Sequence, residues 1–449
     1  MLGMQKLKKT AALGFEILKW VQVNVDQFYG IEIEEFPAQI AQVAMWLTDH
    51  QMNMRVSVEF GQPFIRLPLI HHATIRHGNA LRLDWNDVIS AERVNYILGN
   101  PPFVGAKHMN DVQRQEMALV AGNVPSYGVL DYVAAWYLKA VRYVRGEDSV
   151  QSLLEGFGEG IAPKDRVKLA FVSTNSITQG EQVGVLWSEL LRLGAKIHFA
   201  HRTFRWDNEA RGMAAVHCVI VGFALLDAER KLVFDYADIT GEPHEIAAKN
   251  INPYLIDAAN ILLRNRTTPI CSAPEIGIGN KPIDDGNYLF TGEEKAAFMA
   301  KEPRAAKYFR RWIGSDEFIN RYERWCLWLG DCPPAELRAM PEAMKRVEAV
   351  RKFRLASKSA STRAIADTPT RFHVENFPLS TFLVLPEVSS ERRPFIPIGF
   401  CEPDTLCSNL VKIARNANGF HFGNLSSTMH MAWVRYTCGR LESRYRYSA

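Results

Sequence analysis

The stretch "VNYILGNPPFVGAKHMN", residues 94–110, joins an apolar run to an Asn-Pro-Pro-Phe tetrapeptide at 100–103. Two consecutive prolines cannot continue a hydrogen-bonded strand, because neither carries an amide hydrogen. The sequence therefore predicts a strand at 94–98 that ends sharply before the prolines. In open parallel sheets, ligands bind beyond the carboxyl ends of the strands. The tetrapeptide follows such an end, so we expect it to line a binding site.

The residue types of this tetrapeptide suit an exocyclic amine on a planar base. Pro101 and Pro102 fix the backbone and leave carbonyl oxygens as its available polar groups, while Asn100 adds an amide oxygen and Phe103 a stacking surface. Two acceptors that bind both N–H bonds favour a pyramidal nitrogen and stabilise the positive charge that develops as it attacks a methyl donor. A base in duplex DNA must first be flipped out of the stack. An ordinary strand-terminating turn is the alternative.

Strands and helices alternate along the first half of the chain. Strands are predicted at 25–33, 94–98, 168–174, 196–200 and 214–225, and helices at 37–52, 131–144 and 180–194. This alternation predicts an α/β fold with a doubly wound, mostly parallel, Rossmann-like sheet. The last two strands are separated only by a loop, so we expect them to pair antiparallel at the edge of the sheet.

The alternation fades after residue 226, which divides the chain into three regions. Residues 1–226 are predicted to form a catalytic domain, 227–284 a polar connector, and 285–449 a mixed α+β domain rich in aromatic and basic residues. Within the last region, residues 345–371 hold eight Lys and Arg against two acidic residues. That segment indicates either a phosphate-binding surface or a solvated helix face.

Composition excludes several classes of protein. The chain has 449 residues and a net charge of +4, and it contains no apolar run of the roughly 20 residues that a membrane helix needs. Its seven cysteines include no CxxC pair, which argues against a zinc site or a disulfide framework and favours free thiols in a reducing cytoplasm. We therefore expect a cytoplasmic protein. No two-histidine metal helix or P-loop is present, so we expect no bound metal.

Two further positions are typical of nucleotide-binding folds. Glu32 lies near the end of the predicted strand 25–33, where such folds place an acid that hydrogen-bonds ribose hydroxyls. Asn79 lies in "HGNALRLDW" (77–85), just before an apolar pair, where a polar side chain can reach an adenine edge. Taken alone, a surface glutamate and a plain loop are equally good interpretations of these two positions.

Several blocks resemble the MmeI-like (type IIL) restriction–methyltransferase family in order and spacing. The blocks are "FYGIEIEEFPAQIAQVAMWLTDHQMN" (28–53), "ILGNPPFVGAKHM" (97–109), "AFVSTNSITQGEQVGVLW" (170–187) and "FAHRTFRWDNEARGMAAVHCVIVGF" (199–223). Two later stretches, "VSSERRPFIPIGF" (388–400) and "SSTMHMAWVRYTCGRLESRYRYS" (426–448), resemble that family's target-recognition domain. The resemblance covers nearly the whole chain.

The resemblance implies a site-specific DNA methyltransferase of a restriction-modification system. Such an enzyme transfers a methyl group from S-adenosylmethionine to the N6 amine of a flipped adenine in double-stranded DNA. By position in the Asn100–Phe103 motif, Asn100 and the Pro101 carbonyl would hold the adenine amine, and Phe103 would stack on the base. Phe204 or Trp206 would cover the other face of the base, although aromatic residues of the core are the alternative there.

The resemblance also implies a cofactor site on the earlier strands. Glu32 would bind the ribose of S-adenosylmethionine, and Ile33 would pack on its adenine. Asn79 stands where related enzymes carry the polar residue that contacts the edge of that adenine, and Ala80 next to it would line the same cofactor site.

The sequence departs from this family at both ends. Family members carry a Gly-rich cofactor loop upstream of the Glu32 strand, whereas the only glycines before Gly30 are Gly3 and Gly14. We therefore expect a truncated chain whose sheet lacks its first strand and has an unfilled central position and an exposed edge. On this hypothesis, cofactor affinity falls sharply and the chain cannot methylate alone. A partner polypeptide would then supply the missing loop or the nuclease.

Other functions compete with adenine methylation. One is a DNA-binding recognition module without autonomous catalysis, in which Arg392, Arg393, Trp433 and Arg435 would position DNA or contact base edges. Methylation of a glutamine amide in a protein also uses an Asn-Pro-Pro-aromatic motif, but those enzymes lack a large basic C-terminal domain. The His-x-Glu at 373–375 imitates a zinc deaminase, yet no Pro-Cys-x-x-Cys follows it.

Overall fold

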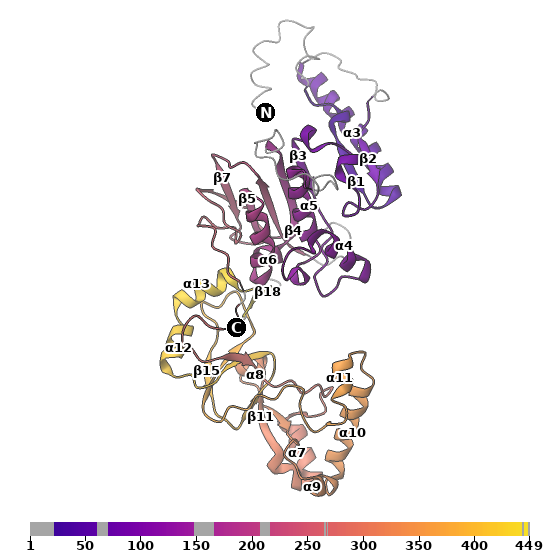
Figure 1. Cartoon of the computed structure of the whole chain (residues 1–449). Coiled ribbons are helices and arrows are strands. Elements are labelled where there is room, and N and C mark those ends of the chain that lie inside the picture. Colours follow the sequence, from indigo (N-terminus) through magenta and orange to yellow (C-terminus); the bar gives the residue numbers. More distant parts are fainter. Residues whose placement is uncertain are drawn as a thin grey trace. The chain divides into compact units, whose positions relative to one another are not determined.

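A computed structural model describes residues 22–60, 71–147, 166–206, 216–264, 266, 268–441 and 444–447. It divides into two compact units, and each is treated by itself below (Figure 1). The first unit extends to Leu262, and the second comprises Leu263 onward together with the short segment Gln179–Glu181.

A six-stranded sheet forms the centre of the first unit, in the order β3-β4-β6-β5-β7-β8. The strands are β3 (Tyr96–Gly99), β4 (Lys168–Thr174), β5 (Lys196–Trp206), β6 (Val216–Ala224), β7 (Lys231–Asp235) and β8 (His244–Ala248). β3 pairs with β4, and β5 with β7, in parallel, whereas the pairs β4/β6, β5/β6 and β7/β8 are antiparallel.

The sheet is therefore mixed, which corrects the prediction of a mostly parallel sheet. The antiparallel partners of β5 and β7 follow them within about ten residues along the chain, and short connections favour antiparallel neighbours. β5 and β6 do pair antiparallel as predicted, but not at the edge. β6 lies between β4 and β5, and β7 and β8 continue the sheet beyond β5.

Helices pack on this sheet and enclose an aromatic core. They are α4 (Asp111–Ala121), α5 (Ala134–Arg145) and α6 (Gly180–Arg192). α4 begins at a capping box between Asn110 and Gln113, and α5 ends at Gly146 with φ 75°, the left-handed conformation that favours glycine. In the core, the Tyr137 ring stacks on Phe223 with a centroid distance of 5.3 Å. This packing fixes α5 against the middle of the sheet.

A separate two-stranded sheet precedes the large one. β1 (Tyr29–Glu32) and β2 (Thr74–His77) pair in parallel, and α3 (Glu35–Phe60) follows β1 along the chain. Within the described residues, β3 has a neighbour only on its β4 side, and its Tyr96 and Leu98 side chains are 66% and 75% exposed. Among the described residues β3 is thus an edge strand, and the expected unfilled position stays a prediction.

The helix predicted at 37–52 is confirmed and is longer at both ends, as α3. Its apolar stripe does not face a core, because Ile40, Val43 and Leu47 are each at least half exposed. These side chains line a shallow apolar depression together with Phe36. Periodicity thus predicted the helix but not what covers its apolar face.

β7 and β8 lie in the region predicted as a connector, 227–284. They pair with the catalytic sheet, so the first compact unit extends to Leu262 and not to residue 226. The pairing of β7 with β5 joins residues more than 30 positions apart, which local composition does not show.

The second unit is mixed α+β, in agreement with the prediction. Its described sheets have the orders β10-β12-β11-β16, β15-β13-β17-β9 and β14-β19-β18. Its strands are β9 (Ile276–Ile278), β10 (Leu289–Thr291), β11 (Phe309–Ile313), β12 (Arg324–Leu327), β13 (Phe382–Pro386), β14 (Val388–Ser389), β15 (Gly399–Cys401), β16 (Thr405–Cys407), β17 (Val411–Ala414), β18 (Arg440–Leu441) and β19 (Arg444–Arg446). Its helices are α7 (Gly292–Lys301), α8 (Ser315–Asn320), α9 (Pro334–Arg338), α10 (Pro341–Leu355), α11 (Ala360–Ala364), α12 (Gly419–Leu425) and α13 (Thr428–Thr437).

Three observations bear on the class of protein. All seven cysteines are free thiols. Among the described residues, no group of three or more ligating side chains is placed to hold a metal ion. No helix in the same part of the chain is both long and apolar enough to cross a membrane.

Candidate active site

The Asn-Pro-Pro-Phe motif directly follows β3, at the carboxyl end of the strand. Gly99, the last residue of β3, pairs with Phe171 of β4, so the motif begins where the parallel pair β3/β4 ends. Asn100 is exposed, Pro101 is buried, and Phe103 is half-buried. The Asn100 amide and part of the Phe103 ring are therefore accessible, while Pro101 packs inside the protein.

Two backbone contacts hold the chain just after the prolines. The Val104 carbonyl accepts a hydrogen bond from the Tyr132 amide at 2.9 Å, and the Ala106 amide donates to Oδ1 of Asp131, also at 2.9 Å. Asp131 and Tyr132 immediately precede α5. The loop after β3 is thus attached to the start of a buried helix.

The four residues predicted for the cofactor gather at the ends of β1 and β2. Glu32 ends β1, and its carbonyl accepts a hydrogen bond from the Gly78 amide at 2.8 Å. Asn79 and Ala80 follow at the end of β2, the parallel neighbour of β1. Ile33 is 57% exposed beside Glu32. A carboxylate, an amide and an exposed apolar side chain therefore lie at the carboxyl ends of these two strands.

The Asn79 side chain is fixed at both of its polar atoms. Its Oδ1 accepts from the Leu81 amide at 2.9 Å, and its Nδ2 donates to Oε1 of Glu116 at 2.8 Å. Glu116 is almost fully buried and also accepts from Nε of Arg82 at 2.7 Å. The amide of Asn79 is therefore oriented by a buried carboxylate.

Tyr132 completes this cluster. Its hydroxyl donates to Oε2 of Glu116. Burial, reinforced by Glu116, raises the pKa of the Tyr132 phenol well above its usual range, so the phenol stays protonated as a donor. Glu116 and Tyr132 thereby connect Asn79 to Val104, while the hydrogen bonds described for this part of the chain include none that joins Asn79 directly to Asn100–Phe103.

Phe204 and Trp206 lie near the end of β5. In the sheet order, β5 is three strands from β3, a separation of roughly 14 Å. Phe204 belongs to an aromatic cluster, with its ring stacked on Tyr236 at 5.3 Å, whereas Trp206 is 43% exposed. Phe204 is half-buried in this cluster, outside the main hydrophobic core, and Trp206 is the more accessible of the two.

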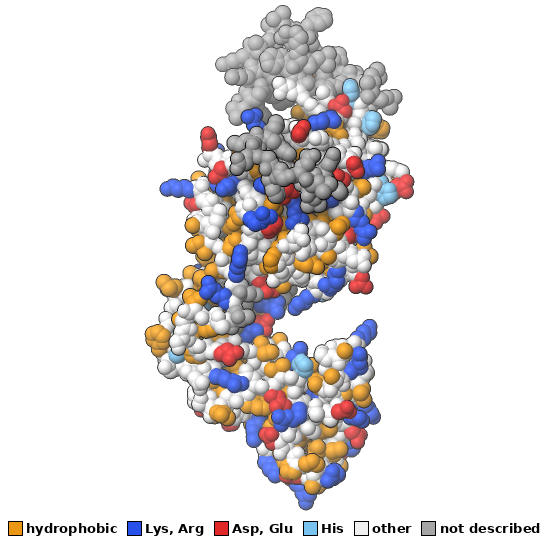
Figure 2. All heavy atoms as spheres, in the orientation of Figure 1, with side chains coloured by type: hydrophobic (Ala, Val, Ile, Leu, Met, Phe, Trp, Pro, Cys, Tyr) orange, Lys and Arg blue, Asp and Glu red, His pale blue; other side chains and the backbone are white. Residues whose placement is uncertain are grey.

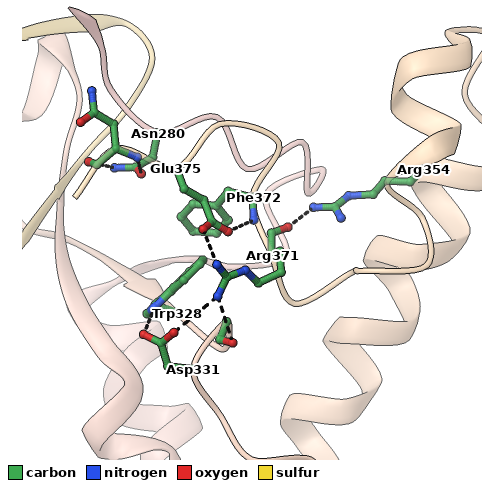
Figure 3. A network of polar contacts seen from close by, with 9 residues as sticks. Asn280, Trp328, Asp331, Arg354, Arg371, Phe372 and Glu375 are labelled. Carbon is green, nitrogen blue, oxygen red and sulfur yellow. Dashed lines mark hydrogen bonds and ion pairs between the residues drawn. The ribbon is translucent and has the colours of Figure 1, made fainter.

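In the second unit, a buried arginine joins two loops. Arg354, in α10, is fully buried and donates to five backbone carbonyls at 2.8–3.0 Å. The acceptors are Pro282, Ile283, Ile365, Thr368 and Arg371. Figure 3 shows Arg354 reaching from its helix to the carbonyl of Arg371.

Arg371 is held by acidic partners on two sides. Figure 3 shows its guanidinium between Glu375 and Asp331, with closest N–O distances of 2.8 and 3.4 Å. Glu375 also accepts from the Phe372 amide at 3.1 Å, so this glutamate organises a turn.

Several basic side chains of the segment 345–371 therefore serve the fold. Arg354 and Arg371 are used within the fold, and Arg346 lies over the Phe290 ring at 4.1 Å. Lys352 and Lys358 are exposed. In Figure 2, basic side chains over the α9–α11 region are interspersed with hydrophobic and acidic ones.

The four residues predicted to position DNA all lie at the surface. Arg392 and Arg393 lie between β14 and β15, and Trp433 and Arg435 lie in α13. All four side chains are exposed. Trp433 is more than half exposed, which is unusual for so large an apolar side chain.

Comparison with known proteins assigns both parts of the chain. Residues 3–235 match the DNA-methyltransferase domain of MmeI, and residues 257–449 match its target recognition domain. The chain belongs to the MmeI family. The predicted family resemblance is thus confirmed for both regions.

Two relatives extend this assignment. The chain is 38% identical, over 448 residues, to DNA methyltransferase A of Bacillus subtilis (strain 168), covering 99% of this chain and 48% of that protein. It is also similar to the solved structure of the Type IIL restriction-modification enzyme MmeI in complex with DNA, with a TM-score of 0.88 and 51% identity. That match covers 99% of this chain and 57% of the other. The chain thus spans about half the length of these MmeI-family relatives.

Sequence reasoning missed the buried polar residues that hold the site together. Glu116, Asp131 and Tyr132 carry no motif, and Asp131 resembles an ordinary residue at the start of a helix. The only signal was that Glu116 and Asp131 lie close to apolar residues in the sequence. A sequence alone does not distinguish such buried acids from acids at the surface.

Proposed function

We propose that this protein methylates the N6 amine of adenine in double-stranded DNA, as the modification activity of a restriction-modification system. The observation that carries this proposal is the position of Asn100–Phe103 at the carboxyl end of β3, with Asn100 exposed, within a region that matches the MmeI methyltransferase domain. The amide oxygen of Asn100 and the Pro101 carbonyl would accept the two amine hydrogens.

The role of these acceptors is electrostatic. As the amine nitrogen attacks, positive charge develops on it, and two fixed acceptors stabilise that charge without a strong base. Phe103, half-buried next to them, offers its ring to the planar base. The adenine would reach this position by flipping out of the duplex.

The chain's own residues fit S-adenosylmethionine at the ends of β1 and β2. Glu32 presents a carboxylate for ribose hydroxyls, and Ile33 an exposed apolar side chain for the adenine face. Asn79 has one amide hydrogen left for the adenine edge, with Ala80 beside it. When bound, this cofactor supplies an electrophilic methyl group on a sulfonium centre.

The second unit would recognise the DNA. Arg392, Arg393 and Arg435 are exposed and suited to phosphates or guanine edges, and Trp433 offers an exposed ring. The match of residues 257–449 to a target recognition domain supports this assignment.

The test is methylation in a bacterial host that lacks adenine methylation. Expression of the complete gene that encodes this chain should place N6-methyladenine at a single DNA sequence, as mapped by sequencing of host DNA. The substitution Asn100→Ala should lower methylation at least ~100-fold, because one acceptor for the developing charge is lost. Asn95→Ala, at the other end of β3, removes an exposed amide and should change nothing. Methylation that persists in Asn100→Ala, or that falls on cytosine, would contradict the proposal.

A second function is favoured by one observation. The small sheet β1/β2, which carries the residues predicted to bind the cofactor, does not pair with β3 in the described structure. On this alternative, residues 1–449 recognise DNA without binding the methyl donor unaided. Calorimetric titration of this chain with S-adenosylmethionine distinguishes the two functions. Micromolar affinity would contradict the alternative in which the chain only recognises DNA.

A further inference from the structure

Asp131 is a buried carboxylate at the end of the catalytic sheet. It is only 8% exposed, and it lies just before α5. Its Oδ1 accepts from the Ala106 amide at 2.9 Å, and its Oδ2 accepts from the hydroxyls of Ser176 and, at 3.3 Å, Thr174. Within the described residues, hydroxyl and amide donors satisfy this charge, and no Lys or Arg forms an ion pair with it.

These donors come from two different strand ends. Ala106 belongs to the loop after β3, which begins with the Asn-Pro-Pro-Phe motif, and Thr174 is the last residue of β4. Asp131 therefore ties the motif loop to the end of the neighbouring strand. Its own amide donates to Oε1 of Gln182 in α6 at 3.0 Å, which fixes the position of Asp131 itself.

The motif loop makes few other hydrogen bonds to the rest of the described protein. Pro101 and Pro102 contribute no amide hydrogen, and the Val104 amide donates to the Pro102 carbonyl at 3.2 Å, within the loop itself. Ala106 is the first residue after the prolines whose amide is shown bonding outside the loop. The Asp131 carboxylate and the Tyr132 amide thus supply attachments that the prolines cannot.

Both oxygens of Asp131 accept hydrogen bonds from the protein's own groups, which suits a role in positioning. We propose that Asp131 is a positioning residue, which holds Asn100 and the Pro101 carbonyl at the distance from β4 that the reaction requires. This inference rests on the proposed methyl transfer to adenine. On this proposal, a carboxylate outside the motif fixes the positions of the two acceptor oxygens.

The experiment compares the complete protein carrying Asp131→Ala, Asp131→Asn or Thr178→Val. Thr178→Val is the matched control, because it removes a buried hydroxyl that donates to Asn175 in the same region without touching the motif loop. Two readouts are measured: kcat and KM for methyl transfer to DNA, and amide hydrogen exchange of peptides that cover residues 100–108.

We expect Asp131→Ala to lower kcat ~100-fold with KM values changed less than about threefold, because misplacement by roughly 1 Å costs that much. Asp131→Asn should lower kcat only ~10-fold, since the hydroxyls of Ser176 and Thr174 can reverse and accept from the new amide. Exchange at 100–108 should accelerate at least ~10-fold in Asp131→Ala while exchange in β6 is unchanged. Thr178→Val should match the wild type in both readouts.

Unchanged exchange at 100–108 in Asp131→Ala would overturn the proposal, as would an unchanged kcat. Exchange that rises equally in β6 would also overturn it, because Asp131 would then support only the overall fold. If the wild type transfers no methyl group to adenine, the proposed function fails. Hydrogen exchange then still decides whether Asp131 holds the loop.

Discussion

At the residue scale, Arg354 shows how a basic side chain can serve the fold instead of a ligand. Its five donors are matched to five carbonyls from the loops around residues 282–283 and 365–371. Only a planar guanidinium presents five donors in one fixed fork. The sequence predicted it as part of a basic surface, because a charge count does not distinguish a buried arginine from an exposed one.

Replacing Arg354 should therefore destabilise the second unit strongly. Arg354→Lys keeps the charge but offers three donors, so at least two buried carbonyls lose their partner, and we expect a loss of about 3 kcal/mol. Urea denaturation followed by tryptophan fluorescence measures this loss. Arg351→Lys is the matched control, because its exposed pair with Asp367 should contribute less than ~1 kcal/mol. Equal effects of the two substitutions would contradict the structural role of Arg354.

At the element scale, the parallel pair β3/β4 sets the position of the motif. Gly99 is the last residue of β3 and faces Phe171, and a Cβ placed there would lie 3.0 Å from two atoms of the Phe171 ring. That ring is almost fully buried and packs against Tyr137 at 5.1 Å, so it cannot easily move away.

Gly99→Ala should accordingly push the strand end, and with it Asn100, away from β4. We expect a stability loss of about 1–2 kcal/mol and a fall in methylation of at least ~10-fold. Thermal unfolding and a methyl-transfer assay measure the two effects. Gly128→Ala is the control, because no atom lies within 4 Å of the added carbon. Full activity in Gly99→Ala would show that the strand end tolerates this displacement.

The same scale shows which elements a sequence can predict. The strand expected at 168–174 is found at those residues as β4, because it alternates buried and half-buried side chains and ends in polar residues. β7 and β8 were missed, since their stability comes from pairing with β5 and with each other, not from a local pattern. The Asn-Pro-Pro-Phe position was predictable, because two prolines after a strand restrict the backbone so strongly. The partners of Asp131 were not, since they are brought together only by the fold.

At the scale of the whole molecule, partly buried histidines make folding depend on pH. Burial lowers the pKa of His198, His201 and His430 below the usual value of about 6.5. His201 stacks on Phe234 with ring centroids 4.3 Å apart, and Nε2 of His430 has no hydrogen-bond partner among the described residues. These environments favour the neutral form of each imidazole in the folded protein.

The sign of the effect follows from proton binding. Between the lowered folded pKa values and about 6.5, the unfolded chain binds more protons than the folded protein, so the free energy of unfolding rises with pH and levels off near pH 7. Urea midpoints measured from pH 5.5 to 7.5 should therefore increase and then become constant. His430→Phe should reduce the slope and keep or raise the midpoint at pH 5.5, because it removes a buried, unpaired nitrogen. A midpoint that falls as pH rises through 6.5 would mean that these histidines are charged in the folded protein.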